Sequence, residues 1–578
     1  MTRLFNDPAD FADEMIDGFV AANSARVRRV TGGVIRNTRS TPGSVAVVIG
    51  GGSGHYPAFG GLVGQGLAHG AAMGNLFASP SAQQVHSVAT AANQGGGIFL
   101  TYGNYAGDVL HFTHAQDRLI EEGIDCRTVV VTDDIAAAPL AEKHKRRGIA
   151  GDLTVFKVAA AASEAAYSLD DIVRVATLAN ERTRSLGVAF TGCTLPGADA
   201  PLFTIPEGRM GVGIGIHGEP GIDETDVPAA AGLAELFVSR LLAELPDGVE
   251  SAEGQRVTVL LNGLGSVKYE ELFVVYSTVV KLLAEAGVTI VEPEVGELCT
   301  SFDMAGASLT LFWLDDELET LWAAPADAPA FRKGSVAPTE ALDDSTIVDV
   351  ATVAIVPGSA ESQAAAATAR AAIDAIAAVI DENADELGRI DAVAGDGDHG
   401  IGMQRGSHAA TAAAAEALEA GAGAQTLLTR AGDAWADRAG GTSGALWGAA
   451  LAALGAALGD EDAPTAASVA EGVTGAKTAI LKFGAVVGDK TMVDALVPFA
   501  DTLSARVAAG STLAAAWQEA ADATSAAAAA TADLLPKMGR ARPHAEKSLG
   551  TPDAGAHSLA LIVQRVAAVL TDSKESTS

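Results

Sequence analysis

The chain changes character near residue 359, and this change most constrains what it can fold into. From residue 359 onward strand signals nearly vanish, and alanine-rich amphipathic segments dominate. Alanine has the highest helix propensity and lets helices pack closely, so this half predicts an all-α domain. Before about residue 320, short apolar runs alternate with glycine turns and helical stretches. Such runs are typical of parallel strands covered on both faces; they are Val45–Ile49, Gly97–Thr101, Thr128–Thr132, Val257–Leu261 and Val288–Val291.

The segment between these halves predicts a linker. Residues 323–358 contain Ala-Pro-Ala-Asp-Ala-Pro-Ala and Val-Ala-Pro-Thr, a composition rich in Pro, Ala and Asp. A chain of 578 residues is also too long for one hydrophobic core. We therefore expect an α/β domain over residues 1–322 and an all-α domain over residues 359–578.

Charge and composition exclude several classes of partner. The formal net charge of −34 repels phosphate backbones and acidic membrane surfaces, so neither nucleic acid nor a membrane is expected as a partner. The apolar runs are short and broken by Gly or charge, so we expect no segment that spans a bilayer. The acidic N-terminus lacks the apolar core of a signal peptide, and three cysteines without metal or redox spacing suit a reducing compartment. We expect a cytoplasmic protein.

A cluster of carboxylates predicts a metal site in the helical half. Asp391, Asp396 and Asp398 lie within eight positions and have no basic residue among them. They can converge only if Gly395 and Gly397 bend the chain. Three convergent carboxylates with open coordination positions describe an Mg²⁺ site that also receives substrate phosphates. The alternative is an acidic surface turn.

Other segments of the helical half fit a phosphate-bearing ligand. Gly440-Gly-Thr-Ser-Gly444 is a glycine-rich turn that enters a helix, where free N–H groups and two hydroxyls can hold phosphate oxygens. Gly488-Asp-Lys-Thr-Met492, Gly539-Arg540 and Pro552-Asp-Ala-Gly555 add a lysine, a guanidinium and a late Asp/Gly loop. Each turn alone can equally be a helix C-cap. Together with the aspartates they favour a nucleoside triphosphate site, and no GxxxxGK[ST] loop is present.

The first half carries histidines and an aspartate in glycine-bounded turns. Gly50-Gly-Gly-Ser-Gly-His55-Tyr-Pro57 directly follows one predicted strand, and Tyr102-Gly-Asn-Tyr-Ala-Gly-Asp108 follows another. A third segment sets His217 between glycines. A single loop histidine is more often a hydrogen-bonded structural residue. Open α/β sheets place their sites at the carboxyl ends of strands, so three such turns indicate a site.

These motifs identify the sequence as similar to the ATP-dependent dihydroxyacetone kinases that fuse a ketose-binding domain and a nucleotide-binding domain in one chain. The resemblance covers nearly the whole chain and includes Phe77-Ala-Ser-Pro-Ser81, Arg146-Arg-Gly-Ile-Ala-Gly151 and Gly-Ile-His-Gly-Glu-Pro-Gly around His217. It implies two α/β subdomains, with a boundary near 185–250, followed by an eight-helix barrel. It also implies Mg²⁺, ATP as cosubstrate, a small ketose substrate and a homodimer.

The resemblance assigns roles to individual residues. It implies that His217 binds the substrate carbonyl covalently as a hemiaminal, that His55 assists, and that Asp108 binds the reacting hydroxyl and can act as its base. Gly52, Ser53, Tyr56 and Gly103 match substrate-binding positions, and Asp391, Asp396 and Asp398 match the Mg²⁺ ligands. The positions matched to the nucleotide-binding loops are His399, Gly400, Gly402, Thr442, Ser443, Gly484, Met492, Arg540, Asp553 and Gly555.

Two departures from the family pattern bear on the substrate. Dihydroxyacetone kinases usually carry Glu and His where this chain has Tyr56 and Phe59, and a lysine at the position of Gly103. Loss of that lysine removes a polar contact and predicts free volume beside Asp108 for a longer ketose. The pattern resembles relatives that phosphorylate four-carbon erythruloses, so D- or L-erythrulose is expected to be at least as good a substrate as dihydroxyacetone.

Two other classes stay open at this point. Stand-alone ketose-binding relatives serve as phosphorelay subunits or transcriptional co-regulators, and some animal relatives also cleave FAD to a cyclic flavin phosphate. The fused nucleotide domain with all three aspartates weighs against a purely regulatory role.

Overall fold

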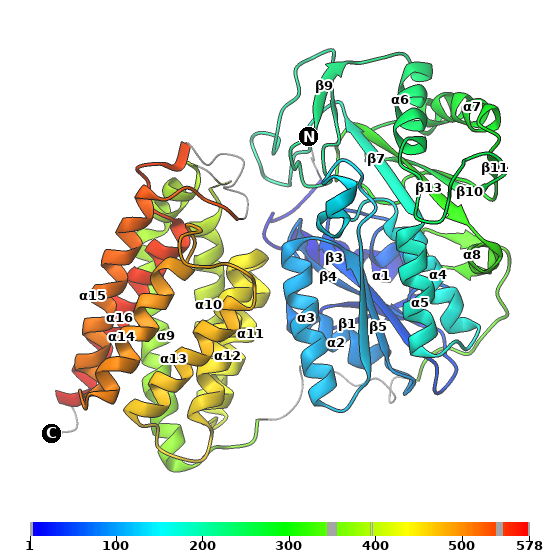
Figure 1. Cartoon of the computed structure of the whole chain (residues 1–578). Coiled ribbons are helices and arrows are strands. Elements are labelled where there is room, and N and C mark those ends of the chain that lie inside the picture. Colours follow the sequence, from blue (N-terminus) through cyan, green and yellow to red (C-terminus); the bar gives the residue numbers. More distant parts are fainter. Residues whose placement is uncertain (1–3, 344–354, 394, 396, 539–546, 576–578) are drawn as a thin grey trace. The chain divides into compact units, whose positions relative to one another are not determined.

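The computed structural model describes residues 4–343, 355–393, 395, 397–538 and 547–575, with side chains described to residue 571. Two compact units divide the chain, Met1–Thr352 and Val353–Ser578. In its described residues the first unit holds two large β-sheets with their helices and a small two-stranded sheet, and the second unit is helical (Figure 1). The α/β fold of the first part and the helical fold of the second are as predicted.

The first sheet has the order β1-β2-β4-β3-β5-β6. Strands β4, β3, β5 and β6 are parallel, while β1 and β2 form an antiparallel hairpin at one edge. Helices α2 and α3 cover one face, and α4 and α5 pack on the other. The bounds are α1 Phe11–Ala22, β1 Val27–Val30, β2 Gly33–Arg36, β3 Ala46–Ser53, β4 Gly70–Leu76, α2 Ala82–Ala92, β5 Ile98–Gly103, α3 Ala106–Glu121, β6 Cys126–Val131, α4 Asp152–Glu164 and α5 Leu169–Glu181.

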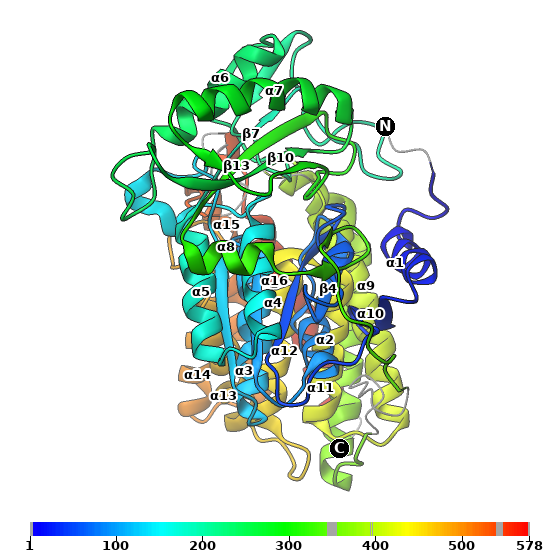
Figure 2. The same cartoon turned by 90° about the vertical axis from the view of Figure 1, so that its right-hand side faces the viewer.

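The second sheet runs β11-β10-β13-β7-β8-β9, with β12 also paired to β10 (Figure 2). Only the β10–β11 and β10–β12 pairs are parallel, so the expectation of parallel sheets throughout was wrong here. The central strand β13 is a nine-residue apolar run that sequence inspection missed. The bounds are β7 Thr183–Ala189, β8 Arg209–Val212, β9 Asp223–Asp226, α6 Ala230–Leu242, β10 Arg256–Gly263, α7 Tyr269–Glu285, β11 Thr289–Ile290, β12 Glu294–Gly296, β13 Gly306–Leu314 and α8 Asp316–Ala323.

The predicted linker begins later than expected. Its first residues form a two-stranded hairpin, β14 Ala326–Asp327 with β15 Arg332–Lys333. Ala326, Ala328 and Phe331 are buried in the core of the first unit. Apolar side chains spaced among the prolines therefore hold this part of the segment on the α/β unit.

The second unit consists of eight α-helices in its described residues, and each packs against the next. Helix α16 also packs against α9, so the ring of contacts closes. The core is built mainly from Ala, Leu, Ile and Val, with Trp435 stacked on Trp447. The bounds are α9 Ala360–Asp391, α10 His399–Glu419, α11 Ala424–Ala439, α12 Gly441–Leu458, α13 Ala466–Leu481, α14 Val493–Ala508, α15 Leu513–Ala530 and α16 Ala554–Glu575.

Three described helices are long and apolar enough to cross a membrane by length and composition: α9, α12 and residues Ala554–Thr571 of α16. The expectation that no segment reaches this threshold was therefore wrong. Alanine and valine raise the mean hydropathy of these helices without bulky side chains. In the structure all three pack against neighbouring helices of the bundle.

Candidate active site

The strand predicted at Val45–Ile49 extends further than expected, into the glycine-rich segment that follows it. Strand β3 continues through Gly50, Gly51 and Gly52 to Ser53, and all four are buried. A Cβ on Gly50 would lie 2.5 Å from the Ala72 carbonyl oxygen, and one on Gly52 would lie 2.8 Å from the Ala78 nitrogen. The first role of these glycines is thus to let neighbouring backbone approach, and the turn proper begins at Gly54, where φ is +104°.

Two histidines from distant parts of the first unit meet at this turn. His55 and His217 face each other with 3.0 Å between their Nε2 atoms. His55 Nδ1 lies 2.8 Å from the Thr300 carbonyl oxygen, and His217 Nδ1 lies 3.1 Å from Glu219 Oε1. The sequence-predicted pair is therefore brought together, each ring oriented by a second partner.

Hydrogen-bond chemistry fixes where the protons of this pair lie. A carbonyl oxygen only accepts, so His55 Nδ1 carries a hydrogen. Burial raises the pKa of Glu219, but His217 and Arg147 outweigh it and lower that pKa to about 2, so the carboxylate accepts from His217 Nδ1. Each Nε2 then has a lone pair, and a contact of 3.0 Å needs one more proton between them. The pair thus shares one positive charge.

The two rings have different partners and different burial. Burial, followed by the charge of His217, lowers the pKa of His55 to about 3. His217 is instead paired with the Glu219 carboxylate, and Arg147 Nη1 lies 3.8 Å from the same carboxylate. Glu219 was missed in the sequence analysis, although it stands two residues after His217 in the quoted motif.

Aromatic rings enclose the two histidines. Phe77 stacks on His55 with 4.8 Å between ring centroids, and Tyr105 meets His217 edge-on at 4.6 Å. Phe77 has φ +51°, a left-handed conformation that is unusual for a bulky residue. This observed strain lies at the site and keeps the ring against His55.

Asp108 lies in the first turn of α3 and is buried. Its Oδ1 has no hydrogen-bond partner. Burial raises the pKa of Asp108 to about 7, although a hydrogen bond from Ser79 and the charge of His217 oppose this shift. The predicted acid is therefore coupled to His217 and poised near neutral pH.

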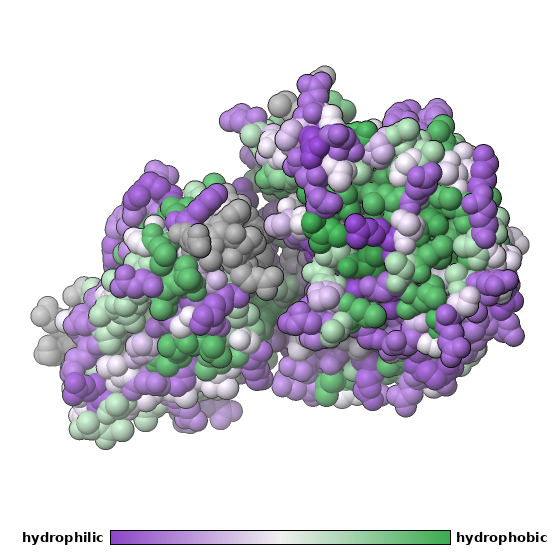
Figure 3. Space-filling view, turned by 45° about the horizontal axis from the view of Figure 1, so that its top comes forward, coloured by the Kyte–Doolittle hydropathy of each residue, from purple (hydrophilic) through white to green (hydrophobic). Residues whose placement is uncertain are grey.

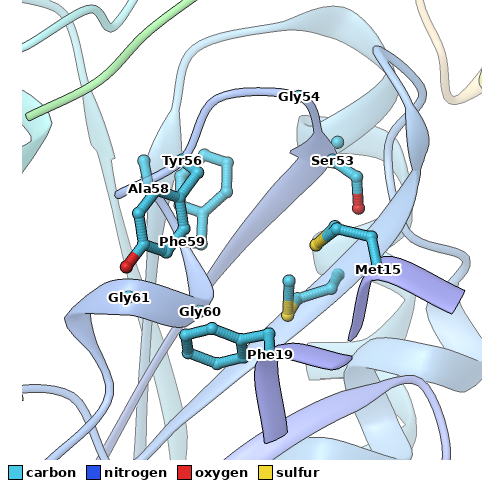
Figure 4. Close-up of a pocket in the computed structure, with 11 residues that line it drawn as sticks. Met15, Phe19, Ser53, Gly54, Tyr56, Ala58, Phe59, Gly60 and Gly61 are labelled. Carbon is cyan, nitrogen blue, oxygen red and sulfur yellow. The ribbon is translucent and has the colours of Figure 1, made fainter. Parts of the chain in front are cut away.

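Three of the predicted substrate-binding residues, Gly52, Ser53 and Tyr56, lie together near the turn, and Gly103 lies elsewhere. The Ser53 hydroxyl donates to the Gly74 carbonyl oxygen at 2.6 Å, so only its backbone faces the turn. Tyr56 is half exposed and packs against Phe19. Together with Gly52 these residues line a cavity between α1 and the turn (Figure 4), whose volume of about 20 Å³ holds about one water. Neither His55 nor His217 lines this cavity.

Gly103 does not open the volume predicted beside Asp108. A Cβ built there would lie 3.2 Å from Asp152 Oδ2 and 3.3 Å from Gly148 Cα. The space that a lysine side chain would enter is therefore already occupied by a buried carboxyl group, and the expectation of free volume was wrong.

The predicted nucleotide and metal residues of the second unit gather at helix ends. Consecutive helices run in opposite directions, so α10, α12, α14 and α16 all begin at one end of the bundle (Figure 1). Asp391 ends α9, Asp398 is the N-cap of α10, and Met492 is the N-cap of α14. Four helix N-termini make this end favourable for anions; the predicted residues in or beside them are His399, Gly400, Gly402, Thr442, Ser443, Asp553 and Gly555.

Specific contacts connect these helix ends. His399 Nε2 lies 3.0 Å from Ser558 Oγ, and a Cβ on Gly555 would be 3.4 Å from Met492 Cβ. Burial raises the pKa of Asp553 to about 7, and the nearby Asp494 and Asp391 carboxylates add to this shift. Gly484 lies between α13 and α14 with φ +88° and no close neighbour. Asp396 and Arg540 lie outside the described residues.

The carboxylates present fit a hard cation. Asp391 Oδ2 accepts from the Gly397 N–H at 2.9 Å, and burial together with Asp391 raises the pKa of Asp398. Mutual repulsion of this kind is what a bound divalent ion relieves, and the donors are the oxygens that Mg²⁺ prefers. Among the described residues no group of three metal-ligating side chains is assembled.

Lys490, which the sequence analysis grouped with the phosphate-binding turns, lies in the interior of the second unit. It is buried, and its Nζ donates to the Leu534 carbonyl, the Ser548 carbonyl and the Ser548 hydroxyl at 3.1, 2.7 and 3.1 Å. The lysine therefore holds neighbouring backbone of the second unit in place.

We expect Lys490→Met to lower the free energy of unfolding of the second unit by about 2 kcal/mol, because two buried carbonyls lose a charged donor. For a unit of this size the melting temperature falls by about 4–8 °C. Differential scanning calorimetry measures this, and Lys537→Met is the control because its exposed ammonium lies 3.6 Å from Asp489 and contributes little. Equal melting temperatures for both variants would show that the hydrogen bonds of Lys490 do not stabilise the second unit.

Comparisons with known proteins show which family the chain belongs to. Residues 17–330 match the Dak1 domain, and residues 393–568 match the DAK2 domain. An L-erythrulose kinase of Pectobacterium atrosepticum is 63% identical over 100% of this chain and 98% of its own length, and a D-erythrulose kinase of Mycolicibacterium smegmatis is 56% identical over 99% of both chains.

A solved structure resembles the whole chain as well. The dihydroxyacetone kinase of C. freundii in complex with AMP-PNP and Mg²⁺ has a TM-score of 0.51 and 28% identity, covering 98% of this chain and 99% of its own. The chain therefore belongs to the dihydroxyacetone kinase family, in the form that joins Dak1 and DAK2 domains, and it is a kinase of the carbohydrate-phosphorylating kind.

Proposed function

We propose that this protein transfers the γ-phosphoryl group of ATP to a terminal hydroxyl of a short-chain ketose, with D- or L-erythrulose at least as good a substrate as dihydroxyacetone. The observation that carries the proposal is the His55–His217–Glu219 arrangement, with the two Nε2 atoms 3.0 Å apart beside Asp108. The names of the relatives, two of them erythrulose kinases, support the four-carbon substrate.

The positions of the protons on His55 and His217 suit covalent capture of a ketone. The extra proton moves from His217 Nε2 to His55 Nε2, which frees the His217 lone pair. That lone pair forms the C–N bond with the carbonyl carbon, and the carbonyl oxygen takes the proton from His55. The product is a neutral hydroxyl on a hemiaminal, while the alkylated His217 ring carries the positive charge.

The net charge facing Glu219 is the same before and after this step. The carboxylate therefore stabilises the imidazolium of the resting pair and that of the hemiaminal without reorganisation. The low pKa of His55, about 3, makes its protonated form a strong acid toward the developing alkoxide. A covalent bond also holds a small sugar that offers little surface for ordinary affinity, and it selects ketones over polyols.

Asp108 serves the second half of the reaction. Its carboxylate accepts the proton of the terminal hydroxyl as that oxygen attacks the γ-phosphorus, and ADP leaves. A base with a pKa of about 7 is half ionised at neutral pH, which suits this task. Positioning of the hydroxyl by the hemiaminal supplies much of the remaining acceleration.

The second unit provides the nucleotide site in this proposal. Asp391 and Asp398, with Asp396 from outside the described residues, would hold Mg²⁺, which when bound neutralises charge on the phosphates. The N-terminal N–H groups of α10 and α12, with Thr442 and Ser443, bind phosphate oxygens. Met492 and Gly555 pack against each other and form an apolar contact surface for the base.

We further propose that the protein is a cytoplasmic homodimer. Helix α7 exposes Tyr269, Phe273, Val274 and Val280 on its outer side. Figure 3 shows hydrophobic residues gathered over one face of the first unit. Exposed apolar patches of this kind are typical of association surfaces.

The test is ADP formation with Mg²⁺-ATP and a panel of D-erythrulose, L-erythrulose, dihydroxyacetone and glycerol. We expect turnover with the ketoses, none with glycerol because it has no carbonyl, and kcat/KM for at least one erythrulose equal to or above that for dihydroxyacetone. A strong preference for dihydroxyacetone would overturn the substrate assignment. No turnover with any ketose would favour a regulatory role. Formation of a cyclic flavin phosphate from FAD with Mn²⁺ would indicate lyase chemistry.

A further inference from the structure

One buried carboxyl group beside the candidate site has no role in the mechanism above. Asp152, the first residue of α4, is 3% exposed, and its Oδ1 has no hydrogen-bond partner. An unpaired buried polar atom costs about 1–3 kcal/mol. By contrast, its neighbour Asp133 accepts from the Ile149 and Gly151 N–H groups at 2.9 Å each. The fold thus satisfies one carboxyl group and leaves the other unpaired.

Two glycines pack directly against this carboxyl group. A Cβ on Gly103 would press on both of its oxygens, at 3.2 and 3.4 Å, and a Cβ on Gly148 would collide with Oδ1. Gly103 ends strand β5, five residues before Asp108. Any side chain at either position would cover or displace Asp152.

Residues of the candidate site surround Asp152. Its charge is coupled to Asp108 and to Tyr105, whose ring packs on His217. The Tyr105 hydroxyl donates to the Gly148 carbonyl at 3.0 Å. Asp152 is also coupled to Cys299, next to the Thr300 carbonyl that receives the His55 hydrogen. Asp152 therefore lies near residues that contact the histidine pair.

The chemistry of this position favours a hydroxyl ligand. Burial and the neighbouring Asp133 and Asp108 carboxylates raise the pKa of Asp152 well above its usual range, which favours the protonated form, and a protonated carboxyl group can both donate and accept. A sugar hydroxyl also both donates and accepts. In the mechanism above, Asp108 already binds the reacting hydroxyl of the ketose. The backbone of the turn at Gly54 is available for a second hydroxyl, on a carbon next to the carbonyl, so Asp152 is left for a third.

We infer that Asp152 is a specificity-determining residue that hydrogen-bonds the additional hydroxyl group of a four-carbon ketose, one that dihydroxyacetone lacks. This inference rests on the proposed function and names the residue behind its substrate preference. Gly103 and Gly148 are small because a Cβ at either position would crowd or collide with this carboxyl group. The longer ketose is favoured by a polar partner and not by empty volume.

The experiment measures kcat/KM for D-erythrulose, L-erythrulose and dihydroxyacetone with the full-length wild type, Asp152→Asn and Asp152→Ala. We expect the alanine variant to lower the ratio of the better erythrulose to dihydroxyacetone at least about tenfold, mainly through KM, because a site that hydrogen-bonds a hydroxyl discriminates by that bond. The asparagine variant, which still donates and accepts, should lose less.

Two further variants keep this test decisive. Gly103→Ala places a methyl group over the carboxyl and should lower the same ratio even if Asp152 variants fold poorly, as judged by circular dichroism. Thr154→Val is the matched control, because it removes a buried hydroxyl in the same helical turn that bonds Gly151 and Thr183 and should leave the ratio unchanged.

The outcomes separate the two proposals. If the wild type uses no ketose, the proposed function fails. If the wild type is an active ketose kinase but Asp152→Ala and Gly103→Ala lower kcat/KM equally for three- and four-carbon substrates, the specificity role is overturned and the carboxyl group serves only the protein interior or a bound water.

Discussion

His217→Ala is expected to lower kcat/KM for every ketose by at least about a thousandfold, because it removes the nucleophile that captures the carbonyl. The residual rate comes from nucleotide binding and from Asp108, which the substitution leaves in place. A coupled assay of ketose-dependent ADP release measures the effect. The ¹³C NMR spectrum of wild type incubated with a ketose labelled at its carbonyl carbon should show a protein-bound tetrahedral carbon that the variant lacks.

The control for this variant is His144→Ala, which removes an exposed histidine of the same unit and should keep wild-type kinetics. Glu219→Gln should fall between the two, since the His217 ring loses its carboxylate partner at 3.1 Å but keeps its Nε2. A His217→Ala enzyme within tenfold of wild type would exclude covalent capture and leave His217 as an ordinary hydrogen-bond donor.

Sequence reasoning predicted the fold class and the identity of the principal site residues, but not how they are supported. Asp108, His55 and His217 could be found because glycines mark the turns in which they lie. Thr300 and Tyr105 could not, since their contacts with the histidine rings exist only in the assembled turns. Partners of this kind are set by tertiary contacts and leave no local spacing signal.

The two errors of interpretation have a common physical origin. Gly50 to Gly52 were taken as a ligand-binding loop, and Gly103 as the edge of an empty volume, because a glycine in a sequence signals only that a Cβ is not tolerated. What replaces the Cβ was decided by packing: backbone and a phenyl ring around β3, and the Asp152 carboxyl beside Gly103. Only the structure distinguishes a close neighbour from an open site.

The mixed second sheet illustrates a further limit. Apolar runs identify buried strands, yet β10 pairs antiparallel with β13 and parallel with β11 and β12. Direction depends on the connections between strands, and β13 follows β12 without an intervening helix. Hydrophobic patterning reports burial on both faces in either case.

Activity is expected to rise with pH through neutrality, because Asp108 must be ionised to accept the hydroxyl proton. An ordinary aspartate is fully ionised above pH 5, but burial raises the pKa of Asp108 to about 7. The ionised fraction, and with it kcat/KM, should therefore increase about tenfold per pH unit below 7 and level off above it. Initial rates in a constant-ionic-strength buffer series, with Mg²⁺-ATP saturating at each pH, give the profile.

Asp108→Asn should abolish the rise of kcat/KM with pH below 7. It should also lower kcat at least about a thousandfold, since an amide cannot accept the proton. Asp117→Asn, an exposed aspartate farther along the same helix, is the control and should keep both the rate and the profile. The protein-bound tetrahedral carbon should still be seen by ¹³C NMR in Asp108→Asn, because capture of the carbonyl uses the histidine pair alone. Loss of the adduct together with the rate would show that Asp108 acts in binding the ketose, and a flat wild-type profile between pH 5 and 7 would exclude it as the base.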